Sequence, residues 1–210
     1  MKRLYIVGAG GFGREMAAWC SHHPDNGAAW ELCGFLDDNP AALDSFDYSP
    51  KTVLPLASHE PGPDECFVCG IGTPSVKRDA CGRLASRGGR FLTLVHPSVI
   101  LGKNVALGEG VVLCPGVIIT CDVTLGNFVM ANIGSTIGHD AVVEDWCTLS
   151  PHCDVTGGAH LHRGVFLGSH ASILPRAVVG ENAVVGAGAV VLRRVRPGAT
   201  VFGVPAGEYS

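Results

Sequence analysis

Aliphatic residues recur at every sixth position through the second half of this 210-residue chain. The series begins at Val95 and ends at Val191 without an insertion, and Ala131 is its one member that is not Val, Ile or Leu. The other members are Leu101, Leu107, Leu113, Ile119, Leu125, Ile137, Val143, Leu149, Val155, Leu161, Leu167, Ile173, Val179 and Val185. Four residues after each comes a second small or β-branched residue, such as Val99 or Ala141. A frame this long is not expected from chance in an ordinary sheet protein.

A repeat of six residues corresponds to one short strand followed by one corner. The long aliphatic side chain fills the interior and the smaller residue fits the crowded corner. Glycine, as at Gly102 or Gly138, relieves the backbone where the chain bends. Three units make one triangular coil of about 18 residues, and such coils stack at the strand spacing of about 4.8 Å. The repeat therefore predicts a parallel β-helix of about six coils.

The composition agrees with this fold and argues against other classes. Glycine accounts for 29 of 210 residues, about twice the usual share, without the three-residue period of collagen. The apolar content of 47% argues against disorder. The longest run without a charged or strongly polar side chain, Gly110–Cys121, is shorter than the roughly 20 residues of a membrane span. A net charge of −4 predicts no nucleic-acid partner. Nine cysteines without a disulfide framework predict reduced thiols and a cytoplasmic protein.

The first 94 residues follow a different pattern, in which short apolar runs alternate with helical segments. We predict strands at residues 4–7, 32–36, 65–71 and 91–95, and helices at 14–21 and 75–87. Strands that alternate with helices indicate a parallel sheet. The sequence therefore predicts two domains: a small Rossmann-like α/β domain at 1–94, and the β-helix at 95–210 with a short C-terminal tail.

A glycine-rich loop, Gly8–Gly13, follows the first predicted strand and precedes the first predicted helix. Its glycines let the backbone approach a phosphate group, whose charge the helix N-terminus favours. NAD is one ligand that fits this pattern, although 94 residues hold at most half of a full dinucleotide fold. Gly70–Thr73 lies at another strand end, where parallel sheets bind ligands. Either loop could also be a tight turn without a ligand.

The chain resembles the hexapeptide-repeat acyltransferases. Within them it is similar to the group of sialic-acid O-acetyltransferases and nucleotide-sugar N-acetyltransferases, which includes the bacillosamine- and perosamine-type enzymes. The resemblance rests on the α/β domain before the repeats, on Ile137–Asp140 midway along them, and on the C-terminal segment Val201–Ala206. It implies a left-handed β-helix, acetyl-CoA as co-substrate, and a homotrimer with active sites between neighbouring chains.

For the N-terminal domain, the resemblance implies a nucleotide-linked sugar instead of a dinucleotide. It implies that three residues of the first loop line the diphosphate or sugar and that one of two aspartates after the second strand binds the nucleoside. Together with one residue of the second loop, the substrate-binding candidates are Gly11, Phe12, Gly13, Asp37, Asp38 and Gly72.

His139 is the candidate general base. Acetyl transfer to an amine needs a base that removes a proton as nitrogen attacks the thioester, and an imidazole near neutrality suits that role. The resemblance implies that Asp140 raises the basicity of this histidine, although the family usually has Glu there. It also implies that the Gly157 amide stabilises the oxyanion, as a fixed N–H aimed at developing charge would.

The remaining candidates concern the acyl donor. Thr148 stands where the family often has a second histidine that meets the donor, and His152 is an alternative nearby in sequence. The resemblance implies that Ser169 and Ala187 line the pantetheine arm of the donor. The cofactor-binding candidates are therefore Thr148, Gly157, Ser169 and Ala187.

These residues predict an acetyl-CoA-dependent N-acetyltransferase acting on a nucleotide-linked amino sugar. Two alternatives stay open: an O-acetyltransferase of the sialic-acid type, and a non-catalytic nucleotide-sugar-binding regulator. His160, His162 and His170 raise the question of zinc, as in the β-helical carbonic anhydrases. Their spacing differs from that of those enzymes and several repeats would have to align, so we expect no metal.

Overall fold

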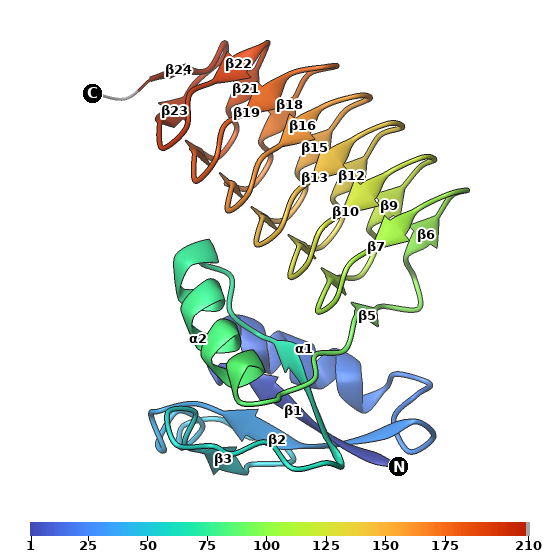
Figure 1. Ribbon diagram of the computed structural model, residues 1–210, viewed down its shortest axis with the longest axis vertical. Coiled ribbons are helices and arrows are strands. Elements are labelled where there is room, and N and C mark those ends of the chain that lie inside the picture. The colour runs from blue at the N-terminus through green and yellow to red at the C-terminus, as the bar shows by residue number, and fades with distance from the viewer. Residues whose placement is uncertain (209–210) are drawn as a thin grey trace. The chain divides into compact units, whose positions relative to one another are not determined.

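The computed structural model describes residues 1–208 of the chain (Figure 1). The chain divides into two compact units, Met1–Leu92 and Thr93–Ser210. The first is an α/β unit and the second consists of short strands wound into a parallel β-helix. The fold class predicted from the repeat and from the strand–helix alternation is thereby confirmed.

The N-terminal unit contains a parallel four-stranded sheet in the order β3-β2-β1-β4. Its elements are β1 (Lys2–Val7), α1 (Gly11–Ser21), β2 (Trp30–Leu36), β3 (Val53–Leu54), β4 (Glu65–Cys69) and α2 (Pro74–Ser86). Every residue of β4 and the last four of β1 are buried. Such continuous burial is typical of parallel strands that are covered on both faces.

Two details of the predicted sheet are wrong. Strand β3 was not predicted, because two residues are too few to form a recognisable apolar pattern in the sequence. The predicted strand at 91–95 is divided: Phe91 makes an isolated bridge to Phe67, whereas β5 (Leu94–Val95) belongs to the second unit. Residues 91–95 therefore lie where the α/β chain passes into the repeat.

The second unit has three sheets, which form the three faces of the β-helix. The first face contains β5, β8 (Val112–Leu113), β11 (Met130–Ala131), β14 (Thr148–Leu149), β17 (Phe166–Leu167), β20 (Val184–Val185), β23 (Thr200–Phe202) and β24 (Gly207–Glu208). The second contains β6 (Ile100–Leu101), β9 (Ile118–Ile119), β12 (Thr136–Ile137), β15 (Asp154–Val155), β18 (Ser172–Ile173) and β21 (Val190–Val191). The third contains β7 (Ala106–Leu107), β10 (Thr124–Leu125), β13 (Val142–Val143), β16 (His160–Leu161), β19 (Val178–Val179) and β22 (Arg194–Val195).

Neighbouring strands within each face are offset by one coil, which is three units of the six-residue repeat. Ile137 pairs with Val155, and the Gly138 amide donates to the Val155 carbonyl at 2.7 Å. From Leu113 to Val191 the interior residue of each strand points inward, so that residues such as Leu149 and Leu167 have no exposed surface, whereas Leu101 in the first coil is exposed. The smaller residues predicted for the corners, such as Ala171, complete the same interior cluster.

Left-handed backbone conformations mark the corners at six-residue intervals. The positions with positive φ are Asn104, Gly110, Gly116, Asp122, Phe128, Gly134, Asp140, Trp146, His152, Gly158, Gly164, His170, Arg176, Asn182 and Gly188. Each lies three residues after an interior aliphatic residue. Gly102 and Gly138, in contrast, stand directly after such a residue. The sequence interpretation therefore assigned the corner strain to the wrong position, because many corner residues are not glycine.

The last coil is shorter than the frame predicts. Val195 pairs with Val179 and Val201 pairs with Val185, so each of these offsets falls short of the regular coil. Val195, which the frame places at a corner, therefore occupies an interior strand position. Antiparallel pairing of β23 with β24 then ends the first face.

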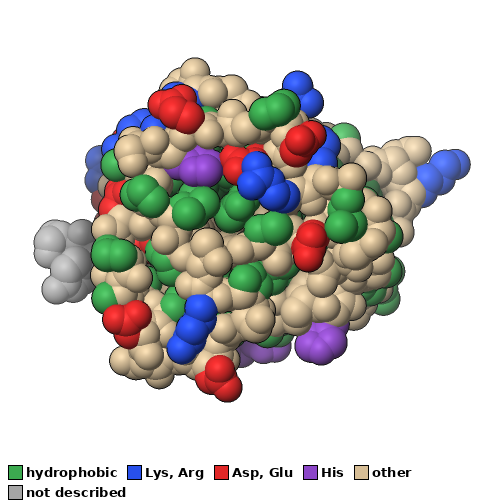
Figure 2. All heavy atoms as spheres, turned by 90° about the horizontal axis from the view of Figure 1, so that it is seen from below, with side chains coloured by type: hydrophobic (Ala, Val, Ile, Leu, Met, Phe, Trp, Pro, Cys, Tyr) green, Lys and Arg blue, Asp and Glu red, His purple; other side chains and the backbone are tan. Residues whose placement is uncertain are grey.

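On the face drawn in Figure 2, basic and acidic side chains are scattered among apolar and uncharged ones. That face carries no patch of a single charge. Among residues 1–208, no helix is long and apolar enough to cross a membrane.

The two kinds of interior position should be sensitive to opposite changes in side-chain volume. Leu167→Ala would leave a cavity and lower the free energy of unfolding by about 2–5 kcal/mol. Ala171→Leu would overfill a corner and lower it by about 1–3 kcal/mol. Both wild-type side chains are fully buried. Urea denaturation measures both changes, with the exposed Glu181→Ala as a control expected to stay within about 0.5 kcal/mol of wild type.

Candidate functional site

The N-terminal unit contains a cavity of about 460 Å³ at the carboxyl ends of its strands. Five predicted substrate-binding residues line it: Gly11, Phe12, Asp37, Asp38 and Gly72. They follow β1, β2 and β4, and β1 is the strand from which the sheet extends in both directions. Ligands of open parallel sheets bind at such a switch point.

The glycine-rich loop serves the cavity in two different ways. Helix α1 begins at Gly11 after the N-cap residue Gly10, so its first-turn amides, which have no acceptor within the helix, lie at the helix end that lines the cavity. Gly13 is not among the residues that line the cavity. A Cβ atom at Gly13 would overlap the Gly8 carbonyl oxygen, so this glycine allows α1 to pack closely on β1. The structure thus places Gly13 in helix–strand packing, and the ligand contacts predicted for Gly11 and Phe12 stay predictions.

The two aspartates after β2 differ in their free hydrogen-bonding capacity. Asp37 accepts hydrogen bonds at both carboxylate oxygens, from the Ala9 amide at 2.8 Å and the Asn39 amide at 2.9 Å. Asp38 accepts one, from the Ala57 amide at 2.7 Å. Asp37 therefore connects the first loop to the end of β2, whereas Asp38 keeps an oxygen without a hydrogen bond from residues 1–208.

Sequence reasoning missed a charged pair on α2. Asp79 and Arg83 both line the cavity and form an ion pair at 2.9 Å with the i,i+4 spacing of a helix. Within the described part of the chain, Arg83 is the one basic residue of the cavity lining. The sequence carries a signal for this pair, because Asp79 and Arg83 are four residues apart on a predicted helix that begins directly after the Gly70–Thr73 loop.

His139 and Asp140 lie together at a corner between the second and third faces of the β-helix, after β12. His139 Nδ1 is 2.7 Å from Asp140 Oδ2, and the side chains are 66% and 68% exposed. Asp140 occupies a left-handed corner position with φ of 60°. The carboxylate thus holds one ring nitrogen, and Nε2 is the nitrogen left to meet a substrate.

Gly157 lies beside His139 on the next coil. A Cβ atom at Gly157 would lie 2.6 Å from His139 Nε2, so only glycine leaves space beside this nitrogen. The Gly158 amide donates to the His139 carbonyl at 2.8 Å. The Gly157 amide itself has no hydrogen-bond acceptor among the described residues. One chain therefore brings a base, its carboxylate partner and an unpaired N–H to the same corner.

Apart from Gly157, the predicted donor residues lie elsewhere on the β-helix. Ser169 and Ala187 occupy consecutive coils at a corner between the first and second faces. Thr148 belongs to β14 on the first face and is 2% exposed. His152 stacks on His170 with ring centroids 5.1 Å apart, at the corner of Ser169. Within one chain these residues do not share a corner with His139, and their donor contacts stay predictions.

Comparison with known proteins assigns both parts of the chain. Residues 3–84 match the family described as the PglD N-terminal domain. Residues 158–193 match the bacterial transferase hexapeptide family with six repeats. The two matches identify a PglD-type N-terminal domain in the first unit and hexapeptide repeats of the bacterial transferase kind in the second.

Two curated proteins similar to this chain are N-acetyltransferases. GDP-perosamine N-acetyltransferase of Escherichia coli O157:H7 is 28% identical over 97% of this chain and 94% of that protein. UDP-N-acetylbacillosamine N-acetyltransferase of Bacillus subtilis (strain 168) is 32% identical over 54% of this chain and 51% of that protein. The second match therefore spans about half of that relative's length.

Solved structures share the whole fold. WeeI from Acinetobacter baumannii AYE has a TM-score of 0.87 at 27% identity, with 100% of both chains covered. PerB from Caulobacter crescentus, in complex with CoA and GDP-perosamine, has a TM-score of 0.80 at 25% identity, covering 100% of this chain and 98% of that one. The hexapeptide-repeat fold with its α/β unit is therefore common to all three proteins.

Two glycines of the first loop should differ in their tolerance of a side chain. Gly13→Ala is expected to lower the free energy of unfolding of the N-terminal unit by about 1–3 kcal/mol, because the new methyl group meets the Gly8 carbonyl. The matched control Gly10→Ala has no atom within 4 Å of its Cβ and should cost less than about 1 kcal/mol. Thermal unfolding checks the order, and an equal loss in both variants would contradict it.

Proposed function

We propose that this transferase moves the acetyl group of acetyl-CoA to the amine of a sugar carried on a nucleoside diphosphate. The observation that carries the proposal is the corner where His139, held by Asp140, faces the unpaired amide of Gly157. Curated relatives that are N-acetyltransferases of nucleotide-linked sugars support it. The free cysteine thiols of the chain are consistent with a reducing cytoplasm, where we expect the protein to act.

The N-terminal cavity supplies the groups that a nucleotide needs. The first-turn amides of α1 and the Arg83 guanidinium offer hydrogen bonds and positive charge to a diphosphate. The second carboxylate oxygen of Asp38 accepts from a nucleoside hydroxyl or base N–H. The glycines at 11 and 72 let the ligand approach the backbone closely.

The proposed reaction is a direct transfer. The sugar amine attacks the thioester carbonyl, and His139 Nε2 accepts the proton that the nitrogen loses. Asp140 holds the Nδ1–H tautomer, which leaves Nε2 as the acceptor. The Gly157 N–H donates to the oxygen that becomes negative in the tetrahedral intermediate. The C–S bond then breaks, and the imidazolium returns its proton to the leaving thiolate of CoA.

A neighbouring copy of the chain would complete this site. The donor residues Ser169 and Ala187 lie at a different corner from His139 and Gly157. Acetyl-CoA held along the corner of Ser169 and Ala187 in one chain would reach His139 of a second chain when the two β-helices lie side by side. A closed ring of three such chains gives three equivalent sites, and we therefore propose a homotrimer.

A thiol-release assay tests the proposed reaction. The protein is incubated with acetyl-CoA and a panel of nucleotide-linked amino sugars, and free CoA is measured with a thiol reagent. We expect release with at least one amino sugar, and a loss of kcat of roughly 100- to 10,000-fold in His139→Ala. KM and oligomeric state should change little in that variant.

His22→Ala is the control, because this exposed imidazole at the C-terminal end of α1 belongs to none of the proposed binding or catalytic groups. Near-normal kcat in His139→Ala would contradict the mechanism. Release with a hydroxyl sugar but none with amines would favour O-acetylation, and nucleotide binding without any release would favour a regulator.

Mixed oligomers test whether the site lies between chains. His139→Ala removes the base and Ser169→Arg blocks the donor corner, so each variant alone should be inactive. Co-expression should restore part of the activity, because some interfaces then combine an intact base with an intact donor corner. Light scattering should give a mass three times that of the 21.8 kDa chain. Absence of any recovery in confirmed mixed trimers would place the whole site within one chain.

A further inference from the structure

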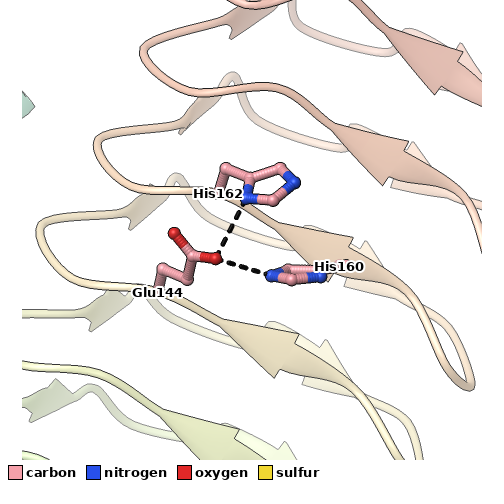
Figure 3. Close-up of side chains that lie close together, drawn as sticks. All are labelled: Glu144, His160 and His162. Atoms are coloured by element: carbon pink, nitrogen blue, oxygen red, sulfur yellow. Dashed lines mark hydrogen bonds and ion pairs between the residues drawn. The ribbon is translucent and has the colours of Figure 1, made fainter.

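Three metal-ligating side chains converge on the β-helix away from His139. Figure 3 shows Glu144, His160 and His162 pointing toward one another from two adjacent coils. Glu144 Oε1 lies 2.8 Å from His160 Nε2 and 2.9 Å from His162 Nδ1. All three ligand atoms lie within 4.8 Å of one another. The acetyl-transfer chemistry proposed above uses none of them.

The register between coils explains why these residues meet. Glu144 and His162 occupy the same position on consecutive coils, and the Glu144 amide donates to the Leu161 carbonyl at 2.9 Å. His160 precedes His162 by two residues, so both imidazoles lie on the same side of the strand. Their rings stack with centroids 4.2 Å apart. The backbone therefore positions all three ligands, and none depends on a long flexible loop.

We propose that Glu144, His160 and His162 bind one divalent transition-metal ion of the zinc type. Two imidazole nitrogens and one carboxylate oxygen are a ligand set that Zn²⁺ uses in proteins, with further positions taken by water. Tetrahedral bonds of about 2.0–2.1 Å separate neighbouring ligand atoms by about 3.3 Å. The two oxygen–nitrogen distances need to widen by only about half an ångström to reach this value. All three side chains are partly exposed and can adjust that far.

The surroundings of the cluster favour a cation. Glu144 Oε2 accepts from the Arg163 amide at 3.0 Å, which orients the carboxylate as an outer partner would. The Arg163 guanidinium lies 3.6 Å from Asp145 Oδ2, which offsets its charge.

Neighbouring coils leave space for the ion. The positions one coil from His160 are Val142 and Val178, which carry no charge. Gly126 stands one coil before Glu144 and Gly180 stands one coil after His162, and neither has a side chain. Water can therefore complete the coordination shell from the open side. A bound ion would connect two consecutive coils and stabilise them against separation.

Metal titration of the purified protein tests this site. After treatment with a chelator and its removal, Zn²⁺ is titrated by calorimetry, and Co²⁺ is added separately for its visible absorption bands. We expect one equivalent per chain and Co²⁺ bands typical of a low-coordinate nitrogen–oxygen site. Saturating Zn²⁺ should raise the Tm by about 5 °C, since an ion that binds only the folded state stabilises it.

Single substitutions identify the ligands. Glu144→Gln, His160→Gln and His162→Gln should each weaken Zn²⁺ binding by about 100-fold or more, since loss of even an outer partner costs about 10- to 100-fold. The matched control His152→Gln alters the other stacked histidine pair and should bind Zn²⁺ like the wild type. Circular dichroism without metal verifies that each variant is folded.

Two results would overturn the proposal. One is the absence of saturable Zn²⁺ binding at micromolar concentrations in the folded wild-type protein. The other is binding that survives all three ligand substitutions or is lost in His152→Gln, which would place the ion on other histidines. Neither result depends on acetyl transfer, so the metal site and the proposed function can fail separately.

Discussion

The hydrogen-bond ladder between successive coils is the constraint on which the β-helical unit depends. Each strand of the regular coils bonds to the strand one coil away, as Ile137 does to Val155. An interior of aliphatic residues without exposed surface keeps this register, because a shift by one residue would turn every inward side chain outward. Side chains at the same position on consecutive coils are therefore forced into contact at the surface, whatever their chemistry.

Both clusters on the β-helix are consequences of this register. Gly157 is the residue one coil after His139, and its missing side chain leaves Nε2 open. His162 is the residue one coil after Glu144, and the two share a hydrogen bond. A rigid ladder holds such groups in place without ordering a loop, which suits chemistry that needs fixed donors and acceptors. The same backbone thus holds both the corner proposed for catalysis and the separate corner proposed to bind a metal ion.

The α/β unit positions its groups by a different rule. Parallel strands end at one edge of the sheet, so the loops after β1, β2 and β4 meet around one cavity. Within that cavity, Asp37 accepts hydrogen bonds at both carboxylate oxygens, whereas Asp38 keeps one oxygen without a hydrogen bond from residues 1–208. The glycines likewise divide their tasks, since Gly13 permits close packing whereas Gly10 and Gly11 open the helix end to the cavity.

The sequence by itself determined the β-helix, because a six-residue period of buried aliphatic residues has few other solutions. It also determined the strand-end loops and the adjacent His139–Asp140 pair, because these depend on neighbours along the chain. Tertiary structure alone decided that Glu144 joins two histidines, that Gly157 lies beside Nε2, and that Asp79 and Arg83 line the cavity. It also decided that the final coil is shortened at Val195. These relations depend on side-chain direction and on corner conformations such as that of Asp140, which a residue pattern does not specify.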